Sequence, residues 1–203
     1  MIDIGANIGG YSMFTAGALG RFTLIIDCYL PNIENIARAV QIQRVQNRVV
    51  LVHNALYSKS GEYITLSKST PSEIQLRETT QQNITSEFVV QTIRFDDLLP
   101  ILIERKVQSV LIKIDIEGSE GFMCEAGSKT FDLIDIQLII MEWGHGFRKW
   151  HRKRYEFMTL FFTERQYIVT DVFCNKLNLT EWETTWPGNV FWIKQINFKN
   201  NIC

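Results

Sequence analysis

Residues 3–10 read DIGANIGG, and this stretch decides how the rest of the 203-residue sequence is interpreted. It follows an apolar start, and residues 9–19 have the small and apolar side chains of a helix that packs against a sheet. Gly5 and Gly9 allow the backbone to approach a ligand closely because they lack a Cβ atom. Asn7 stands where another glycine is common, and asparagine tolerates the left-handed conformation better than other non-glycine residues. The stretch therefore predicts a strand, a ligand-binding loop and a helix.

The same alternation of strand and helix continues along the chain. Apolar runs predict strands at residues 1–4, 22–28, 49–55, 88–95, 110–114, 136–141, 167–173 and 190–196. Helical spacing predicts helices at residues 9–19, 119–131 and 150–165, another that opens at Pro31, and a short one capped by Asp96 or Asp97. Such alternation predicts an α/β fold with a mainly parallel sheet and helices on both faces. Ligands of such sheets bind at the carboxyl ends of the strands.

One segment departs from this alternation. Residues 58–61 (SKSG) have the composition of a turn between short strands. Residues 67–87 are polar and rich in Ser, Thr and Gln. We expect residues 67–87 to form a long surface loop, which could act as a lid.

Composition and charge are those of an ordinary soluble protein, with 46% hydrophobic and 21% charged residues. The length suits a single domain over residues 1–203. The net charge of -1 provides no basic field for nucleic acid or an anionic membrane. No apolar run reaches the roughly 18 residues of a membrane helix. Because the glycine-rich stretch follows Met1 and Ile2 directly, we expect that an upstream segment, which could hold an anchor or a targeting signal, is missing.

The four cysteines are widely spaced and form no C-x-x-C pair; they are Cys28, Cys124, Cys174 and Cys203. This spacing indicates neither a zinc site nor a redox motif. We expect reduced thiols, most of them buried.

The spacing of the loop and its acidic neighbour discriminate between nucleotide ligands. A dinucleotide-binding loop has the pattern G-x-G-x-x-G and holds a pyrophosphate at the helix N-terminus, whereas this loop is G-x-N-x-G-G. Asp3, directly before the loop, would repel a pyrophosphate but suits a cationic ligand. S-adenosylmethionine carries a sulfonium and an ammonium group, so we predict it as the cofactor. The residues predicted to hold it here are Asp3, Gly5, Ala6, Asn7 and Gly9.

Two later strand ends supply further candidate cofactor contacts. Asp27 ends the second predicted strand, about 20 residues beyond the loop, where an acid can accept the ribose hydroxyls. Asn54 and Ala55 end the third, where an adenine edge is expected. Asp27 could instead cap a helix, and asparagine is common at strand ends.

Three segments of the chain resemble the FkbM-type methyltransferases. DIGANIGGYS at residues 3–12 is similar to that family's cofactor loop, and HNALYSKSGE at residues 53–62 to its third strand and following turn. IKIDIEGSE at residues 112–120, preceded by TIRFDDLL at residues 92–99, is similar to its fourth-strand signature. The resemblance covers residues 3–131. It implies a Rossmann-like class I methyltransferase fold with an antiparallel last strand, S-adenosylmethionine as donor, and acceptors that are mostly hydroxyl groups of small molecules and sugars.

Methyl transfer to a hydroxyl requires an aligned acceptor oxygen and removal of its proton. Asp115 and Glu117, at the carboxyl end of the fourth parallel strand, are the candidate base group. Lys113 lies on the same side of that strand as Asp115 and could pair with one of the acids. Asp115 could instead orient the cofactor, and Glu117 could cap the next helix. Two close carboxylates could also bind a divalent metal, but because no third ligand is evident in the sequence we predict no metal site.

Glu142 and His145 follow the fifth parallel strand in the motif MEWGHG, at the same edge of the predicted sheet. His145 is an alternative general base, because its glycine neighbours would let it approach a substrate. The competing interpretation is a structural or surface histidine.

Residues 147–155 (FRKWHRKRY) mix basic and aromatic residues, as nucleic-acid binders do. The same run is typical of one amphipathic helix, with Trp150, Phe157 and Phe161 inward and the charges in solvent. Given the net charge, we favour the second interpretation.

The leading hypothesis is therefore methylation of a hydroxyl group on a small molecule or glycan. An NAD-dependent oxidoreductase is disfavoured by the loop spacing and by Asp3. A degenerate methyltransferase fold that acts as a binding module is supported by the expected loss of an upstream segment, but opposed by the intact loop, Asp27 and Asp115. Nucleic-acid methylation would require the basic helix to line the acceptor cleft.

Overall fold

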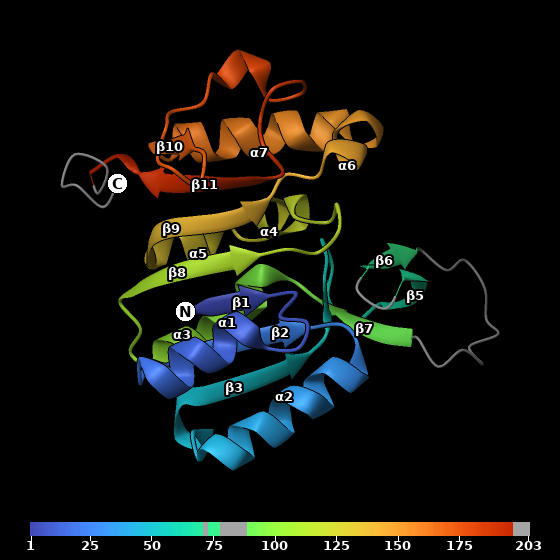
Figure 1. The fold of residues 1–203 in the computed structure, drawn as a ribbon, viewed down its shortest axis with the longest axis vertical. Coiled ribbons are helices and arrows are strands. Elements are labelled where there is room, and N and C mark those ends of the chain that lie inside the picture. The colour runs from blue at the N-terminus through green and yellow to red at the C-terminus, as the bar shows by residue number, and fades with distance from the viewer. Residues whose placement is uncertain (71–72, 78–88, 197–203) are drawn as a thin grey trace.

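The computed structural model describes residues 1–70, 73–77 and 89–196 of the chain. It contains a seven-stranded sheet (Figure 1), whose strands lie in the order β10-β11-β9-β8-β1-β2-β3. In chain order these strands are β1 (Ile2–Ile4), β2 (Thr23–Asp27), β3 (Val49–His53), β8 (Ser109–Ile114), β9 (Asp135–Glu142), β10 (Tyr167–Thr170) and β11 (Asn189–Lys194). All seven fall within or beside the apolar runs of the sequence, so these strand predictions are confirmed.

The pairing directions put the switch point of the sheet beside β1. β1 pairs in parallel with β2 and with β8, and parallel pairing continues to β3 on one side and β9 on the other. β11 is antiparallel to both of its neighbours, β9 and β10. The mainly parallel sheet with an antiparallel last strand is therefore confirmed. Because the chain runs outward from β1 to β3 and later resumes at β8, the loop after β1 lies where α/β sheets bind ligands.

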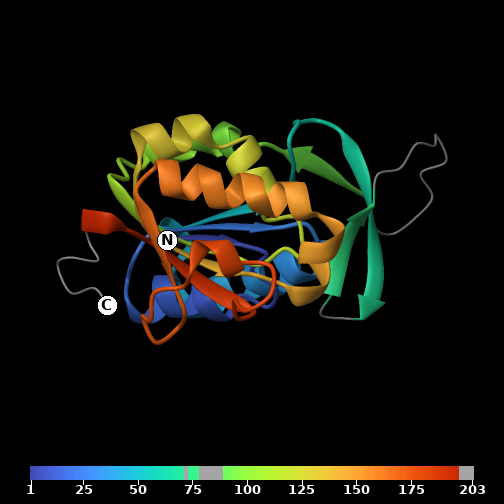
Figure 2. The same cartoon turned by 90° about the horizontal axis from the view of Figure 1, so that it is seen from above.

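Helices cover both faces of this sheet (Figure 2), as predicted. One face carries α1 (Gly10–Met13), its π-helical continuation Phe14–Ala18, and α2 (Leu30–Gln43). The other face carries α3 (Leu99–Glu104), α4 (Gly121–Glu125), α5 (Ser128–Leu133) and α7 (Arg152–Glu164), while α6 (His145–Trp150) follows β9. Short 3₁₀ turns cover Gln46–Arg48, Phe95–Leu98 and Leu179–Glu181.

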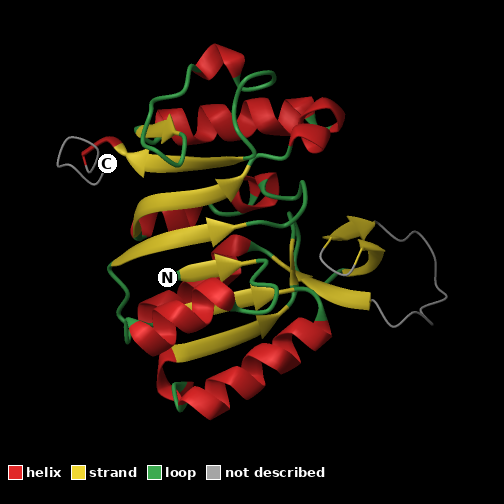
Figure 3. Ribbon diagram, viewed as in Figure 1, coloured by secondary structure: helices red, strands yellow, loops and turns green. Residues whose placement is uncertain are grey.

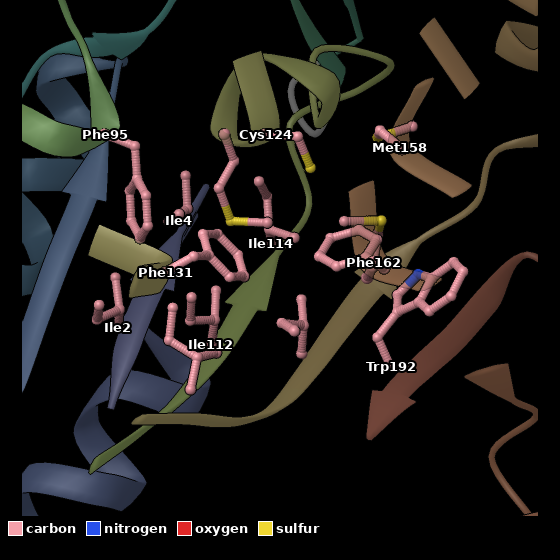
Figure 4. Close-up of a cluster of buried hydrophobic side chains, with 14 of the residues drawn as sticks. Ile2, Ile4, Phe95, Ile112, Ile114, Cys124, Phe131, Met158, Phe162 and Trp192 are labelled. Atoms are coloured by element: carbon pink, nitrogen blue, oxygen red, sulfur yellow. The ribbon is translucent and has the colours of Figure 1, made fainter. Parts of the chain in front are cut away.

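Alternating side chains of the strands build a separate core on each face. Ile25 packs in the cluster of α1 and α2, whereas its neighbours Leu24 and Ile26 belong to the larger cluster of the opposite face. In that larger cluster, isoleucines of β1 and β8 meet aromatic side chains such as Phe131 and Phe162 (Figure 4). Burial on both faces explains why these strands appear as continuous apolar runs in the sequence.

A smaller four-stranded sheet lies beyond the carboxyl ends of the main strands (Figures 1 and 3). Its order is β4-β7-β5-β6, formed by β4 (Ala55–Leu56), β7 (Val89–Ile93), β5 (Tyr63–Thr70) and β6 (Glu73–Arg77). The expectation of a long loop is thus wrong at residues 67–70 and 73–77, which pair as antiparallel strands. Their polar composition conceals Thr70 and the alternation of Ile74 and Leu76 with polar residues, which is the pattern of a strand. The rest of the predicted loop lies outside the described residues.

Two predicted helices are each divided in the structure. Residues 119–131 give α4 and α5, which are separated by the non-helical backbone of Ala126 (φ -126°) and Gly127 (φ -128°). Asp96 caps the second of these helices rather than the one after it in sequence, since its carboxylate accepts hydrogen bonds from Thr130 N and Oγ1 at 2.9 and 3.0 Å. Residues 150–165 give the end of α6 and all of α7.

The basic run of residues 147–155 is arranged differently from the predicted amphipathic helix. Trp150 is 83% exposed and Phe157 40% exposed, so both point outward, while Phe161 is buried. Arg148, expected in solvent, is fully buried. This correction follows from the break between α6 and α7, which changes the helical phase.

Arg148 joins α6 to the segment before β11. Its guanidinium donates hydrogen bonds to the main-chain oxygens of Trp143, Trp182 and Trp186 at 3.0, 2.9 and 2.7 Å. Further contacts at 3.4 Å reach the oxygens of Glu183 and Pro187. One side chain therefore donates to several main-chain carbonyl groups, of which Trp182 O also accepts from Trp143 Nε1 at 3.1 Å.

Two further sequence expectations concern the whole chain. Cys174 is disulfide-bonded, whereas Cys28 and Cys124 carry free thiols. The expectation of reduced cysteines is therefore wrong at Cys174. Within the described ranges, no helix has both the length and the apolar character needed to cross a membrane.

We expect Arg148→Lys to lower the free energy of unfolding by about 3 kcal/mol, because an ammonium group cannot reach all of these carbonyls and each one left unpaired costs about 1–3 kcal/mol. Urea denaturation measures this loss. The exposed Arg38→Lys is the control, with a change below about 0.5 kcal/mol. Equal stability of the two variants would show that the Arg148 contacts are dispensable.

Candidate active site

A pocket opens at the carboxyl ends of β1, β2 and β8, beside β4. Seven of the predicted site residues line it: Gly5, Asn7, Asp27, Asn54, Ala55, Asp115 and Glu117. Six residues that were not predicted complete the lining: Ile4, Ile26, Cys28, Asn32, Leu56 and Ile116. The predicted residues Asp3, Ala6, Gly9 and Lys113 are not part of this lining. The sequence therefore located the pocket but not its full wall.

The loop after β1 is held by contacts that only glycine allows. Gly5 has φ +73°, and a Cβ built on it would lie 1.9 Å from the main-chain oxygen of Asp115. Gly9 has φ +84°, and its Cβ would lie 2.8 Å from Ile36 Cγ1 in α2. Asn7 has φ +52°, which confirms the predicted left-handed conformation. Both glycines thus make room for protein neighbours, whereas the sequence argument gave the approach of a ligand as the reason.

Asp27 links the loop to the start of α2. Its carboxylate accepts hydrogen bonds from the main-chain N–H groups of Asn7 and Tyr29, both at 2.8 Å. The amide of Asn32 adds contacts at 3.3 and 3.4 Å. Burial raises the pKa of Asp27, and these hydrogen bonds oppose that rise. Asn32 stands in the first turn of the helix after Asp27, a position that the sequence analysis did not consider.

Asp3 and Lys113 lie beneath the loop. Lys113 Nζ donates a hydrogen bond to Gly5 O at 2.7 Å, and lies 3.8 Å from Asp3 Oδ1 and 3.6 Å from Asp115 Oδ2. Ser12 Oγ donates to Asp3 Oδ2 at 2.5 Å. The pairing of Lys113 with a neighbouring acid therefore occurs as predicted. Asp3 is fully buried, so in this geometry it supports the loop from below.

Asn54 and Ala55 form a further part of the pocket wall. Asn54 Nδ2 donates to Gln91 O in β7 at 2.9 Å, and Ala55 pairs with Thr92 of the same strand. Both residues therefore connect the pocket to the small sheet.

Acidic side chains gather at the carboxyl ends of β8 and β9. Asp115, Glu117 and Glu142 each place one carboxylate oxygen within 4.8 Å of the others. Glu117 has φ +56°, so it stands in a left-handed turn rather than at the start of a helix. Close carboxylates can share a proton, act as a base or bind a cation. Glu142 was noted in the sequence for its position, but its distance to Asp115 depends on the pairing of β8 with β9.

Glu120 lies beneath this group. Its Oε1 accepts hydrogen bonds from Ile116 N at 3.0 Å and Gly118 N at 3.2 Å, which supports the turn that carries Glu117. Burial raises the pKa of Glu120 to about 7. Burial, together with the charge of Asp115, raises the pKa of Glu142 to about 8. The sequence analysis did not single out Glu120. Its spacing of three residues from Glu117, which is typical of an acid that caps a turn, could have indicated it.

His145, the alternative base, is the first residue of α6. Its side chain lies outside the described part of the structure. The backbone nevertheless starts α6 three residues after Glu142, at the same end of the main sheet.

Comparisons with known proteins were made for the whole chain. A family model described as "Methyltransferase FkbM domain" matches residues 3–169. A search of curated proteins gives no significant match. Among solved structures, an O-methyltransferase from Bacillus cereus in complex with SAH aligns with TM-score 0.50 and 12% identity over 95% of this chain and 73% of that chain.

Two further solved structures are similar at lower scores. A Clostridium thermocellum protein assigned as an rRNA methylase has TM-score 0.47 and 12% identity over 94% of this chain and 85% of that chain. P. horikoshii TYW2 in complex with MeSAdo has TM-score 0.39 and 12% identity over 96% of this chain and 56% of that chain. At such identities the likeness concerns the fold alone.

We expect Gly5→Ala to weaken binding of S-adenosylhomocysteine and to destabilise the chain by at least about 1 kcal/mol, because alanine is strained at positive φ and its Cβ meets Asp115 O. Gly10→Ala is the matched control, since nothing lies within 4 Å of a Cβ there. Calorimetry and thermal unfolding measure both effects. Unchanged affinity in Gly5→Ala would contradict the loop assignment.

The raised pKa values also predict how stability varies with pH. In the unfolded chain a glutamate has a pKa of 4.5, whereas in the folded chain the pKa is about 7 for Glu120 and about 8 for Glu142. Between these pH values the folded state binds more protons than the unfolded state. Stability therefore falls as pH rises through this window and is constant above it. In chelator-treated protein, Glu120→Gln should reduce this fall, whereas the exposed Glu104→Gln should not. Thermal unfolding against pH measures the slope, and identical slopes would refute the prediction.

Proposed function

Because the chain belongs to the FkbM methyltransferase domain family, we propose that it transfers a methyl group from S-adenosylmethionine to a hydroxyl oxygen of a small molecule or sugar. Family membership and the strand order establish a Rossmann-like methyltransferase fold, methyl-transfer chemistry and S-adenosylmethionine as the donor. The proposal adds the acceptor class and the roles of individual residues. The observation that carries it is an acidic cluster, of which Asp115 and Glu117 line the cofactor pocket.

The residues of the pocket fit the donor chemically. Asp27 ends β2 at the position where an acid accepts ribose hydroxyls. Beyond the bonds from Asn7 and Tyr29, the carboxylate receives only the long Asn32 contacts at 3.3 and 3.4 Å, which a ribose hydroxyl would replace. Ile26 and Leu56 offer apolar walls for a purine ring, and Asn54 offers a polar edge. When bound, S-adenosylmethionine supplies an electrophilic methyl group on a sulfonium sulfur.

Asp115 is the residue we assign as proton acceptor for the hydroxyl. Its side chain is 44% exposed, so an acceptor can reach it, and Lys113 holds it at 3.6 Å. Glu117 lines the same pocket and is the second candidate. A positioned base contributes about 10²- to 10⁴-fold to the rate. His145 is a third candidate by its place at the start of α6.

The basic surface of α6 and α7 supports a small acceptor over a nucleic acid. Arg148 is turned into the protein, and Arg152 and Arg154 form ion pairs with acidic side chains. The chain as a whole has a net charge of -1. Binding of a nucleic-acid backbone depends on basic side chains that are available to its phosphates; three of those on this surface are engaged, and Lys149 and Lys153 are exposed.

An assay with S-adenosylmethionine that carries a labelled methyl group tests the proposal against sugars, small alcohols and an RNA. We expect label on a hydroxyl compound, and Asp115→Asn to lower kcat by about 10²- to 10⁴-fold while the affinity for S-adenosylhomocysteine stays constant. Asp132→Asn, an exposed change away from the pocket, is the control. Label on the RNA alone would refute the acceptor class. If Asp115→Asn instead weakens binding of S-adenosylhomocysteine and leaves kcat unchanged, Asp115 is a cofactor ligand and not the base.

A further inference from the structure

The acidic cluster has the dimensions of a cation site. Asp115 follows β8 directly, Glu117 stands in the left-handed turn, and Glu142 is the last residue of β9. Their carboxylate oxygens lie within 4.8 Å of one another. Divalent cations that prefer oxygen bind ligands at about 2.0–2.6 Å, so two ligand oxygens on one ion stand up to about 5 Å apart. The cluster therefore supplies the third ligand that the sequence did not reveal.

Glu120 is an independent observation at the same place. It is 1% exposed, and its Oε1 is held by the N–H groups of Ile116 and Gly118 on either side of Glu117. Its second oxygen, Oε2, has no hydrogen-bond partner among the described residues and no contact with solvent. The charge of Glu120 acts on Glu142 and that of Asp115 on Glu120, so this unpartnered carboxylate lies against the cluster. Glu142 Oε2 is likewise buried without a partner.

The basic side chains nearby that the structure describes do not pair with Glu120 or Glu142. Lys113 is directed to Gly5 O and shared between Asp3 and Asp115. Arg148 is surrounded by main-chain carbonyl oxygens. In the described part of the chain, no basic side chain forms an ion pair with Glu120 or Glu142. Buried carboxylates require a cation or a proton in compensation.

We propose that Asp115, Glu117 and Glu142 bind one divalent cation of the Mg²⁺, Mn²⁺ or Ca²⁺ type beside the cofactor pocket, with Glu120 adding negative charge beneath it. Binding of the cation is independent of the acceptor, but its role rests on the proposed function. A cation held there would act on an acceptor hydroxyl as a Lewis acid and make it more acidic.

The reaction then balances with Asp115 as the base. The hydroxyl proton passes to Asp115, the acceptor oxygen forms a bond to the methyl carbon, and the carbon–sulfur bond breaks with its electron pair going to sulfur. In this arrangement Asp115 offers one carboxylate oxygen to the cation and the other to the proton.

Calorimetric titration of the full, chelator-treated chain with MgCl₂, MnCl₂ or CaCl₂ alone tests the site. We expect one cation per chain, and an affinity at least about tenfold weaker in Glu142→Gln. Glu104→Gln, at the exposed end of α3, should bind as the unmodified chain does. The same binding should raise the Tm of the chain, which also identifies a variant that folds poorly. Asp115→Asn is the second variant in that case.

No binding at millimolar cation, or equal binding by Glu142→Gln, would overturn the proposal. Titration with S-adenosylhomocysteine separates this failure from failure of the proposed function. If the chain binds S-adenosylhomocysteine but no cation, only the proposed cation site is refuted. If the chain binds the cation but not S-adenosylhomocysteine, the cation site stands and the assignment of the pocket as a methyl-donor site is refuted.

Discussion

The close contact between Gly5 and the end of β8 is the constraint on which the site depends. The loop after β1 lies so near Asp115 that no Cβ fits between them. At the same residue, Gly5 N donates to Ile26 O at 2.9 Å, and Gly5 O accepts from Lys113 Nζ at 2.7 Å. One residue therefore fixes the loop to the strands on both sides of β1. As a result, the carboxylates of Asp27 at the end of β2 and Asp115 after β8 both line one pocket.

Much of the fold could be predicted because burial on both faces leaves a simple pattern in the sequence. The strands of the main sheet are continuous apolar runs, and the left-handed Asn7 follows from its backbone tolerance. Residues 67–70 and 73–77 were misassigned because their strands are stabilised by pairing in a small, polar sheet. Arg148 was misassigned because its partners are main-chain oxygens distant in sequence.

The candidate site shows the same division between local and long-range information. Asp27 and Asp115 could be found because each stands at the end of an apolar strand. The convergence of Glu142 with Asp115 and Glu117 depends on the parallel register of β8 and β9, in which Ile114 lies beside Met141. Glu120 and Asn32 act through short contacts within turns, which spacing alone does not distinguish from ordinary surface positions. The contacts of Asn32 with Asp27, and of Glu120 with the turn around Glu117, are evident only in the structure.

Calorimetric titration of the purified chain with S-adenosylhomocysteine, and with NAD as the competing nucleotide, tests the central claim most directly. The pocket between Gly5, Asp27 and Asp115 has an acidic, non-dinucleotide loop, so we expect one S-adenosylhomocysteine per chain and no binding of NAD. Binding of NAD, or a folded chain that binds neither compound, would contradict the account of the pocket.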